Sequence, residues 1–187
     1  MTTTEIDPRT SYAGALDWAA TVVDGVRPDQ RGLPTPCPEL DVDGLLRHLV
    51  ATVHKIAAIG DGADPTTLPF QVPTGDCPAL AAARAEMERV WSADDALARE
   101  VRVPWGTAPG AVALWGYVNE LLVHTWDVAV ATGQHPEAPA GLVEPVLGAA
   151  QRLIPEQRDG SPFAPAVTPR PEAGPTERLA NWSGHRW

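Results

Sequence analysis

The chain has 187 residues and a mass of 19.9 kDa, a size typical of one domain. Apolar residues make up 44% and charged residues 20%, so the chain can bury a sizeable core and is not disordered as a whole. Its 14 basic and 24 acidic residues give a formal net charge of −10, which argues against nucleic-acid binding. No apolar run reaches the ~18–20 residues of a membrane span and no export signal is recognisable, so we expect a cytoplasmic protein without a membrane partner.

The two cysteines, Cys37 and Cys77, are too few for a disulfide scaffold and show no CxxC spacing. Both lie near the starts of expected helices. We interpret them as small packed residues rather than as metal ligands or nucleophiles.

The prolines divide the chain. Four long stretches contain none, namely 9–27, 39–64, 79–103 and 110–135. Each is long enough for a helix of several turns, and prolines, which interrupt helices, cluster between them. This distribution predicts an all-α four-helix bundle.

Apolar residues recur at three- and four-residue steps in these stretches, as in Leu45, Leu49 and Val53 of the second. The expected caps or first residues are Ser11, Asp41, Asp76 and Thr107 or Pro109. Gly60 and Gly133 are expected to end the second and fourth helices. The segment 98–105 is the one candidate for extended structure.

After Pro136 the pattern is less regular. Residues 142–154 predict a short fifth helix with Pro145 in its first turn. Residues 155–187 are expected to form an irregular tail packed on the bundle, with one helical turn at 178–182. No linker divides the chain, so we expect residues 1–187 to be a single domain.

Metal-capable side chains converge in the fourth stretch. Glu120 and His124 are four residues apart, which places them on one helix face, and Asp127 follows three residues later. His48, in the second stretch, is the natural third ligand. A His/Glu/His set suits zinc and leaves a position open for water or substrate, as catalytic sites require. Asp127 is expected to hydrogen-bond a ligand histidine rather than to bind the metal.

Two simpler interpretations stay open at this point. A Glu-x3-His pair arises by chance in an acidic chain and then forms an exposed ion pair, and His48 fits a hydrogen-bonded core histidine equally well. Trp105, Trp115 and Tyr117 are candidates to line a pocket. The sequence has no GxSxG nucleophile motif and no glycine-rich phosphate loop.

Two motifs carry a family resemblance. TPCPELDVDGLLRHLV (35–50) and ELLVHTWDVAVATGQ (120–134) resemble the two signatures of an actinobacterial metal-binding family. Its members are similar to the N-terminal domain of mycothiol-dependent maleylpyruvate isomerase, within the DinB-like superfamily of four-helix bundles. SPFAPAV (161–167) and RLANWSGHR (178–186) resemble the short tail of its stand-alone members.

The resemblance implies a DinB-like bundle with up-down-down-up topology and a short additional C-terminal helix or tail. It implies that His48, Glu120 and His124 bind the metal, and the long 65–78 connection suits that topology. Leu40 departs from the family pattern, which has an aromatic residue after its CP motif. No counterpart of the extra C-terminal domain of true maleylpyruvate isomerase is recognisable, so we do not expect maleylpyruvate itself to be the substrate.

The leading hypothesis is therefore a metal-dependent thiol transferase or isomerase that activates mycothiol for attack on an electrophilic small molecule. Zinc is the first expected metal, although nickel, iron or copper fits the same ligands. The alternatives are a hydrolase with a metal-activated water and a non-catalytic metal- or ligand-binding module. A homodimer is one candidate assembly.

Overall fold

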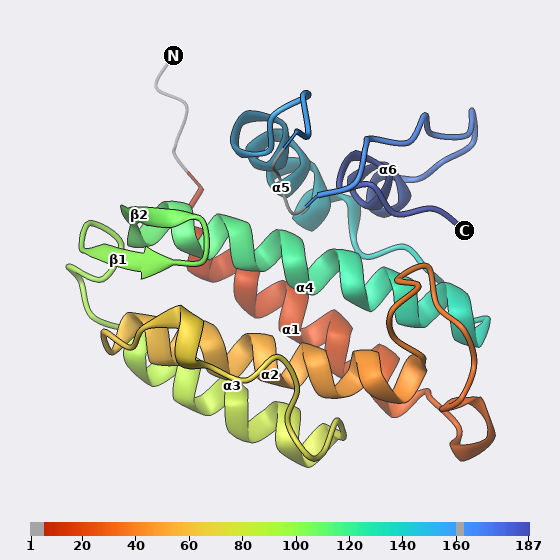
Figure 1. The fold of residues 1–187 in the computed structure, drawn as a ribbon, viewed down its shortest axis with the longest axis horizontal. Coiled ribbons are helices and arrows are strands. Elements are labelled where there is room, and N and C mark those ends of the chain that lie inside the picture. Colours follow the sequence, from red (N-terminus) through yellow and green to blue (C-terminus); the bar gives the residue numbers. More distant parts are fainter. Residues whose placement is uncertain (1–5, 160–162) are drawn as a thin grey trace.

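Six helices and one short hairpin make up the part of the chain that the structure describes, residues 6–159 and 163–187 (Figure 1). In this computed structural model the helices are α1 (Pro8–Asp24), α2 (Val42–Gly60), α3 (Cys77–Trp91), α4 (Gly110–Thr132), α5 (Ala140–Leu153) and α6 (Pro175–Trp182). The strands are β1 (Glu100–Val103) and β2 (Gly106–Pro109), and two 3-10 turns are η1 (Pro28–Gln30) and η2 (Pro65–Thr67). The expectation of a predominantly helical protein is confirmed.

Aspartates begin the first three helices. The Asp41 carboxylate accepts a hydrogen bond from the Gly44 amide at 2.8 Å, and that of Asp76 accepts one from Ala79 at 2.9 Å, so both predicted caps are confirmed. The predicted cap at Ser11 is wrong, because α1 begins at Pro8 and is capped by Asp7, four residues before Ser11. Pro8 does not interrupt this helix, since the first helical position needs no N–H donor.

Helix α4 begins directly after Pro109 and ends at Thr132 with Gly133 as its C-terminal cap, as predicted. Gly133 has φ 68°, a left-handed conformation that glycine adopts without steric cost and that closes the helix. Before α4 the chain forms the hairpin of β1 and β2, which pair from Glu100↔Pro109 to Val103↔Gly106. The expected extended segment therefore exists.

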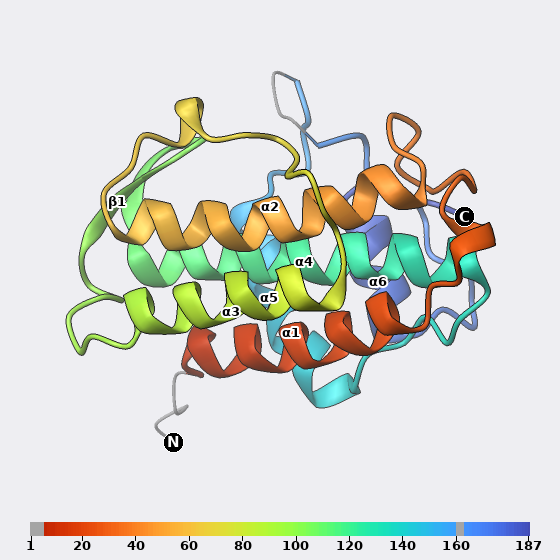
Figure 2. The same cartoon turned by 90° about the horizontal axis from the view of Figure 1, so that it is seen from below.

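The four longest helices lie side by side. α1 contacts α3 and α4, and α2 likewise contacts α3 and α4 (Figure 2). The connection from α2 to α3 runs back along the molecule, so these two helices point in the same direction. Their facing sides hold the apolar core, in which Tyr12, Leu45, Leu49, Leu121 and Leu122 are almost completely buried.

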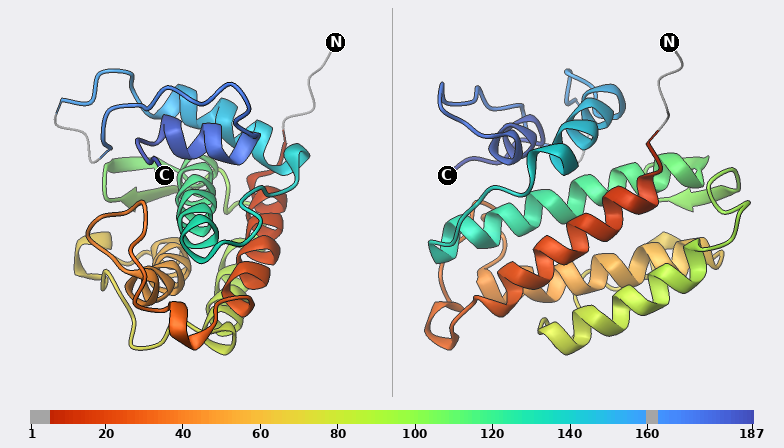
Figure 3. Two further views of the ribbon diagram at one scale, coloured as in Figure 1. Left: turned by 90° about the vertical axis from the view of Figure 1, so that its right-hand side faces the viewer. Right: turned by 180° about the vertical axis from the view of Figure 1, so that it is seen from behind.

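The C-terminal part covers the remaining side of α4. Helices α5 and α6 pack against each other and on α4, away from α2 and α3 (Figure 3). α4 is thus in contact with four other helices, which is why apolar residues surround it on nearly all sides. Along the described ranges, no helix is both long and apolar enough to cross a membrane.

Two details of this part differ from the sequence-based expectation. Helix α5 begins at Ala140, two residues earlier than expected, so Pro145 lies inside the helix rather than in its first turn. The Pro145 ring nitrogen cannot donate to the Gly141 carbonyl, one turn before it. The single turn expected at 178–182 is instead the end of α6, which starts at Pro175.

Candidate metal centre

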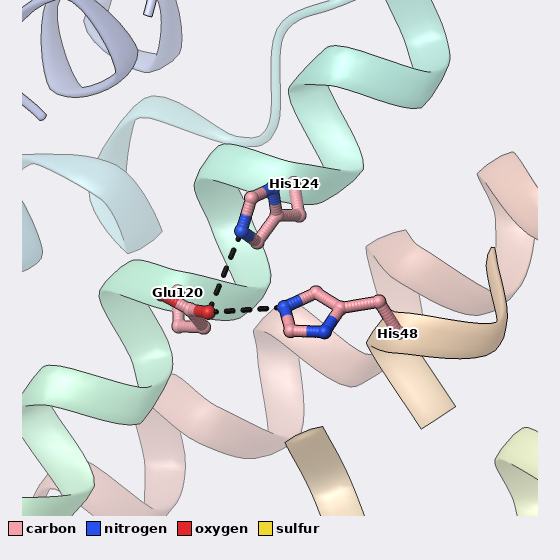
Figure 4. A group of neighbouring side chains, drawn as sticks. All are labelled: His48, Glu120 and His124. Carbon is pink, nitrogen blue, oxygen red and sulfur yellow. Dashed lines mark hydrogen bonds and ion pairs between the residues drawn. The ribbon is translucent and has the colours of Figure 1, made fainter. Parts of the chain in front are cut away.

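His48 of α2 points across the bundle toward Glu120 and His124 of α4 (Figure 4). Glu120 Oε1 lies 3.2 Å from His48 Nε2 and 3.4 Å from His124 Nε2. One ligand-type atom from each residue lies within 4.8 Å of the other two. The structure therefore brings together the three residues that the sequence singled out as ligands.

Hydrogen bonds orient both imidazole rings. His48 Nδ1–H donates to the Phe70 carbonyl oxygen at 2.8 Å, and His124 Nδ1–H donates to Asp127 Oδ2 at 2.9 Å. Because a carbonyl and a carboxylate oxygen only accept, each ring carries its proton on Nδ1 in these bonds. The Nε2 atoms of both rings are thereby directed at the same carboxylate oxygen.

This donor set fits a cation. Two ring nitrogens and a carboxylate oxygen can all accept, so the group is stable only when a proton or a metal ion lies among them. Ligand atoms ~2.0–2.1 Å from a tetrahedral zinc ion lie about 3.3–3.4 Å apart, close to the distances between the nitrogens and Glu120 Oε1. The residues present thus suit a divalent metal.

The three side chains differ in exposure. The side chains of His48 and His124 are only 5% and 11% exposed, whereas that of Glu120 is 35% exposed. Part of the Glu120 side chain is therefore reached by solvent, whereas both imidazoles are almost completely covered.

The ionisation states of Glu120 and His124 depend strongly on each other. Burial by itself raises the pKa of Glu120, but the charge and hydrogen bonds of His124, together with His48, outweigh it and hold that pKa well below 4.5. Burial lowers the pKa of His124, yet the nearby carboxylates of Glu120 and Asp127 outweigh it and raise that pKa well above 6.5. Without a metal, a proton thus serves as the cation of this group.

Asp127 was expected from the sequence to hold a ligand histidine, and its carboxylate does contact His124. It is 0% exposed, and it also accepts from His185 Nδ1–H, which lies 3.0 Å from Oδ1 and 2.9 Å from Oδ2. Burial raises the pKa of Asp127, but the hydrogen bonds from His124 and His185 outweigh that effect and lower it. Two donors therefore keep this buried carboxylate ionised.

Sequence reasoning missed two participants. His185 was assigned to the tail without a role, and the only available signal was its place in the RLANWSGHR motif. The Phe70 carbonyl had no signal at all, since any residue supplies a backbone oxygen. The Phe70 ring also stacks on His48 with ring centroids 4.2 Å apart, although 54% of Phe70 is exposed.

The three aromatic residues that the sequence proposes for a pocket differ from one another in exposure and in the helix face they occupy. The Trp105 and Tyr117 rings are 6.0 Å apart, with Trp105 exposed and Tyr117 buried one turn before Glu120. Trp115 lies two positions from Tyr117, about 200° around the helix, and is half-buried against the core. A pocket lined by these three residues stays a prediction.

A tyrosine that the sequence did not single out as a site residue feels the charge of Glu120. Tyr12 of α1 is completely buried, and its hydroxyl has no hydrogen-bond partner among the described residues. Burial raises the pKa of Tyr12, and the negative charge of Glu120 raises it further. This phenol therefore stays protonated and can donate a hydrogen bond.

The remaining histidines lie apart from this group, and the cysteines are not activated by it. His54 forms an exposed pair with Glu86 at 2.8 Å, and His135 accepts from the Glu137 amide in a loop. Burial raises the pKa of both the Cys37 and Cys77 thiols, and for Cys37 it outweighs the positive charge of His124. Neither cysteine is thus activated as a thiolate nucleophile.

Fold and site together define a helical protein with a His/Glu/His group that bridges two of its long helices. The family model described as the mycothiol maleylpyruvate isomerase N-terminal domain matches residues 13–129, and the chain belongs to this family. The match includes His48, Glu120, His124 and Asp127 but not His185.

Relatives extend the similarity over almost the whole chain. It is 32% identical over 181 residues to the uncharacterized proteins Rv0738 and MT0763 from two strains of Mycobacterium tuberculosis, covering 96% of this chain and 98% of theirs. Among solved structures, it resembles the mycothiol-dependent maleylpyruvate isomerase and a single-residue mutant of that enzyme. Each has a TM-score of 0.61 and 17% identity, covering 88% of this chain and 77% of the other. That likeness shows a shared fold.

Proposed function

We propose that this chain is a divalent-metal-dependent thiol transferase or isomerase that uses mycothiol, or a similar low-molecular-weight thiol, as cosubstrate. His48, Glu120 and His124 would hold the metal. The observation that carries the proposal is that two imidazoles, each with its proton held on Nδ1, direct their Nε2 atoms at one carboxylate oxygen of Glu120. Membership of the family and the name of the similar solved enzyme support the choice of thiol.

Each residue of the group would have a distinct role in binding the metal. His48 and His124 offer neutral nitrogen ligands, and Glu120 supplies one negative charge. The Phe70 carbonyl and Asp127 keep both rings from turning.

A bound divalent metal would lower the pKa of a coordinated thiol from ~8.5, so that a thiolate is available at neutral pH. In the proposed reaction the thiolate sulfur forms a bond to an electrophilic carbon, and the displaced electron pair takes up a proton. A transferase retains the new carbon–sulfur bond. An isomerase breaks it again after rotation of the adduct, which releases the thiol unchanged.

Zinc is the metal we propose first, because imidazole nitrogen and carboxylate oxygen are among its usual ligands. The same donors accept nickel, iron or copper, and affinity rises from iron through nickel to copper. Competition between zinc and these ions in the untagged protein, with the intracellular metal content measured beside it, identifies the resident metal.

We also propose that α1 to α4 form a DinB-like bundle with up-down-down-up topology and that the chain works as a single domain. The shared direction of α2 and α3, and the contacts of α1 and α2 with both α3 and α4, support this topology. The packing of α5 and α6 on α4 supports a single domain.

The first experiment is elemental analysis of untagged protein, since a histidine tag would itself bind metal. We expect one divalent ion per chain in the wild type and none in His124→Ala. The matched control is His54→Ala, which removes an exposed histidine paired with a carboxylate and should leave the metal content unchanged. Retention of metal by His124→Ala would overturn the assignment.

The second experiment separates thiol chemistry from water chemistry. Cobalt-substituted protein is titrated with mycothiol while its visible spectrum is recorded. A new sulfur-to-cobalt charge-transfer band is expected. Unchanged spectra, combined with metal-dependent hydrolysis of activated esters, would instead favour a hydrolase, and the absence of both activities would favour a binding module.

A further inference from the structure

The C-terminal residues form an ordered turn against α4. Ser183 Oγ donates to Asn119 Oδ1 at 3.3 Å, next to Glu120 in the sequence. The His185 amide donates to the Ala180 carbonyl at 2.9 Å, and the Asn181 side-chain amide donates to the His185 carbonyl at 3.0 Å. The backbone of His185 is thus fixed on both sides.

Gly184 makes this turn sterically accessible. Its φ is 97°, which side chains rarely tolerate, and a Cβ at this position would lie 2.7 Å from the Ala164 carbonyl oxygen. The turn brings the His185 ring to 5.4 Å from the His124 ring, measured between centroids. The side chain of His185 is 20% exposed, so the turn seats it mostly inside the protein.

Asp127 links the two rings. Its Oδ2 atom lies 2.9 Å from His124 Nδ1 and 2.9 Å from His185 Nδ1. Since Asp127 is fully buried, each of its hydrogen bonds must come from the protein, and these two histidines are the partners found in the described residues. Removal of either donor leaves a buried carboxylate partly unsatisfied, which costs free energy and permits it to turn.

We propose that His185 is a positioning residue of the metal centre, which acts through Asp127 on the ligand His124. This inference rests on the proposed metal site. His185 holds the carboxylate in the orientation that keeps the His124 proton on Nδ1, and this leaves Nε2 free to bind a metal. The C-terminal turn therefore contributes to the geometry of the metal site, although it lies outside the family match at 13–129.

The test uses the full-length untagged protein and zinc. Zinc affinity is measured by competition with a chromophoric chelator for the wild type, His185→Ala, His185→Asn and Arg186→Ala. Loss of a residue that hydrogen-bonds a metal ligand typically weakens metal binding 10–100-fold. We expect a weakening on the order of 10-fold for His185→Ala, because His185 contacts Asp127 and not the ligand His124 itself.

The other variants separate positioning from general disturbance of the tail. Asparagine places its side-chain amide where the histidine carries Nδ1–H, so His185→Asn should recover most of the affinity. Arg186 is exposed and adjacent, and Arg186→Ala should bind zinc like the wild type. A long-range ¹H–¹⁵N spectrum of the metal-free protein adds a direct readout when it is recorded above the raised pKa of His124, where this ring is neutral. Under these conditions His185→Ala should increase the share of His124 with its proton on Nε2.

The outcomes are distinguishable. If His124→Ala loses zinc while His185→Ala binds it as tightly as the wild type, the metal centre stands and the positioning role is wrong. If His185→Asn is as weak as His185→Ala, the tail supports the fold rather than the ligand, and the proposal is overturned. A wild-type chain that takes up no divalent ion would overturn the metal centre and this inference with it.

Discussion

His48 Nε2 lies 3.2 Å from Glu120 Oε1, although 72 positions separate the two residues along the chain. His124 Nε2 approaches the same oxygen from the neighbouring turn of α4, at 3.4 Å. A carboxylate oxygen shared by two ring nitrogens requires a cation among them, and this requirement underlies each statement about function made above. Three predictions test its physical basis, and two more test the helix that carries His48 and the reactivity of the cysteines.

Glu120→Gln retains the size of the side chain and removes its negative charge. Because an amide oxygen is a much weaker metal ligand than a carboxylate, we expect zinc affinity to fall by at least about 100-fold, the upper end of the effects of residues that only support ligands. Isothermal titration with zinc measures the change. Glu144→Gln, an exposed residue of α5, makes the same change in net charge and should have no effect.

The metal-free protein should be most stable in mildly acidic solution, as far as this group contributes. The pKa of Glu120 lies below 4.5, so its contribution is complete above about pH 4.5 and is lost as the pH falls through the lowered value. The pKa of His124 lies above 6.5, so its contribution is complete below about pH 6.5 and is lost as the pH rises through the raised value. The two contributions coincide between these limits.

Bound zinc should offset the loss of stability that the metal-free protein shows as the pH rises above neutrality. Binding displaces the proton of His124, so the increase in Tm caused by zinc should grow from about pH 5.5 to about pH 8. Thermal melts with zinc and with a chelator, at matched ionic strength, give this difference at each pH. An increment that does not change with pH would show that no proton is displaced.

Asp41→Ala tests the helix that carries His48. The Asp41 carboxylate satisfies the Gly44 amide, and loss of such a cap typically costs about 1 kcal/mol, within a range of about 0.5–2 kcal/mol. Urea unfolding of the metal-free protein should show this decrease. Asp41→Ser keeps a capping oxygen and should recover most of it, whereas equal losses in both variants would contradict a capping role.

The cysteines should be slow to react. Burial raises the pKa of the Cys37 and Cys77 thiols above 9.0, so their thiolate fraction at neutral pH is smaller than that of free cysteine. Iodoacetamide should therefore modify the folded protein more slowly than it modifies free cysteine, and urea should remove the protection. Cys37→Ser should retain zinc binding. If this variant no longer binds zinc, Cys37 belongs to the metal site.

The helices could be predicted from the sequence because their causes are local. Proline-free stretches, an aspartate before the first turn and a closing glycine act within a few residues, and they located α2, α3 and α4 well. The errors at Ser11 and Pro145 have local causes too. Pro8 is compatible with the first position of a helix, and the start of α5 carries no capping side chain.

The relation between Glu120 and His124 was also a local matter, since a spacing of four residues places two side chains on one helix face. The same spacing suits an exposed ion pair, so the sequence alone did not distinguish a ligand pair from a surface pair. That distinction came from His48, and only the packing of α2 on α4 brings His48 to them.

The sequence by itself therefore determined the helices and the shared face of Glu120 and His124. The tertiary structure decided that His48 completes the group, that the Phe70 carbonyl orients its ring, and that His185 reaches Asp127 from 58 positions away. The physical reason is that the period of a helix fixes which of its own residues share a face. Which faces of distant helices meet depends on how the whole core packs, and a backbone carbonyl carries no side-chain signature.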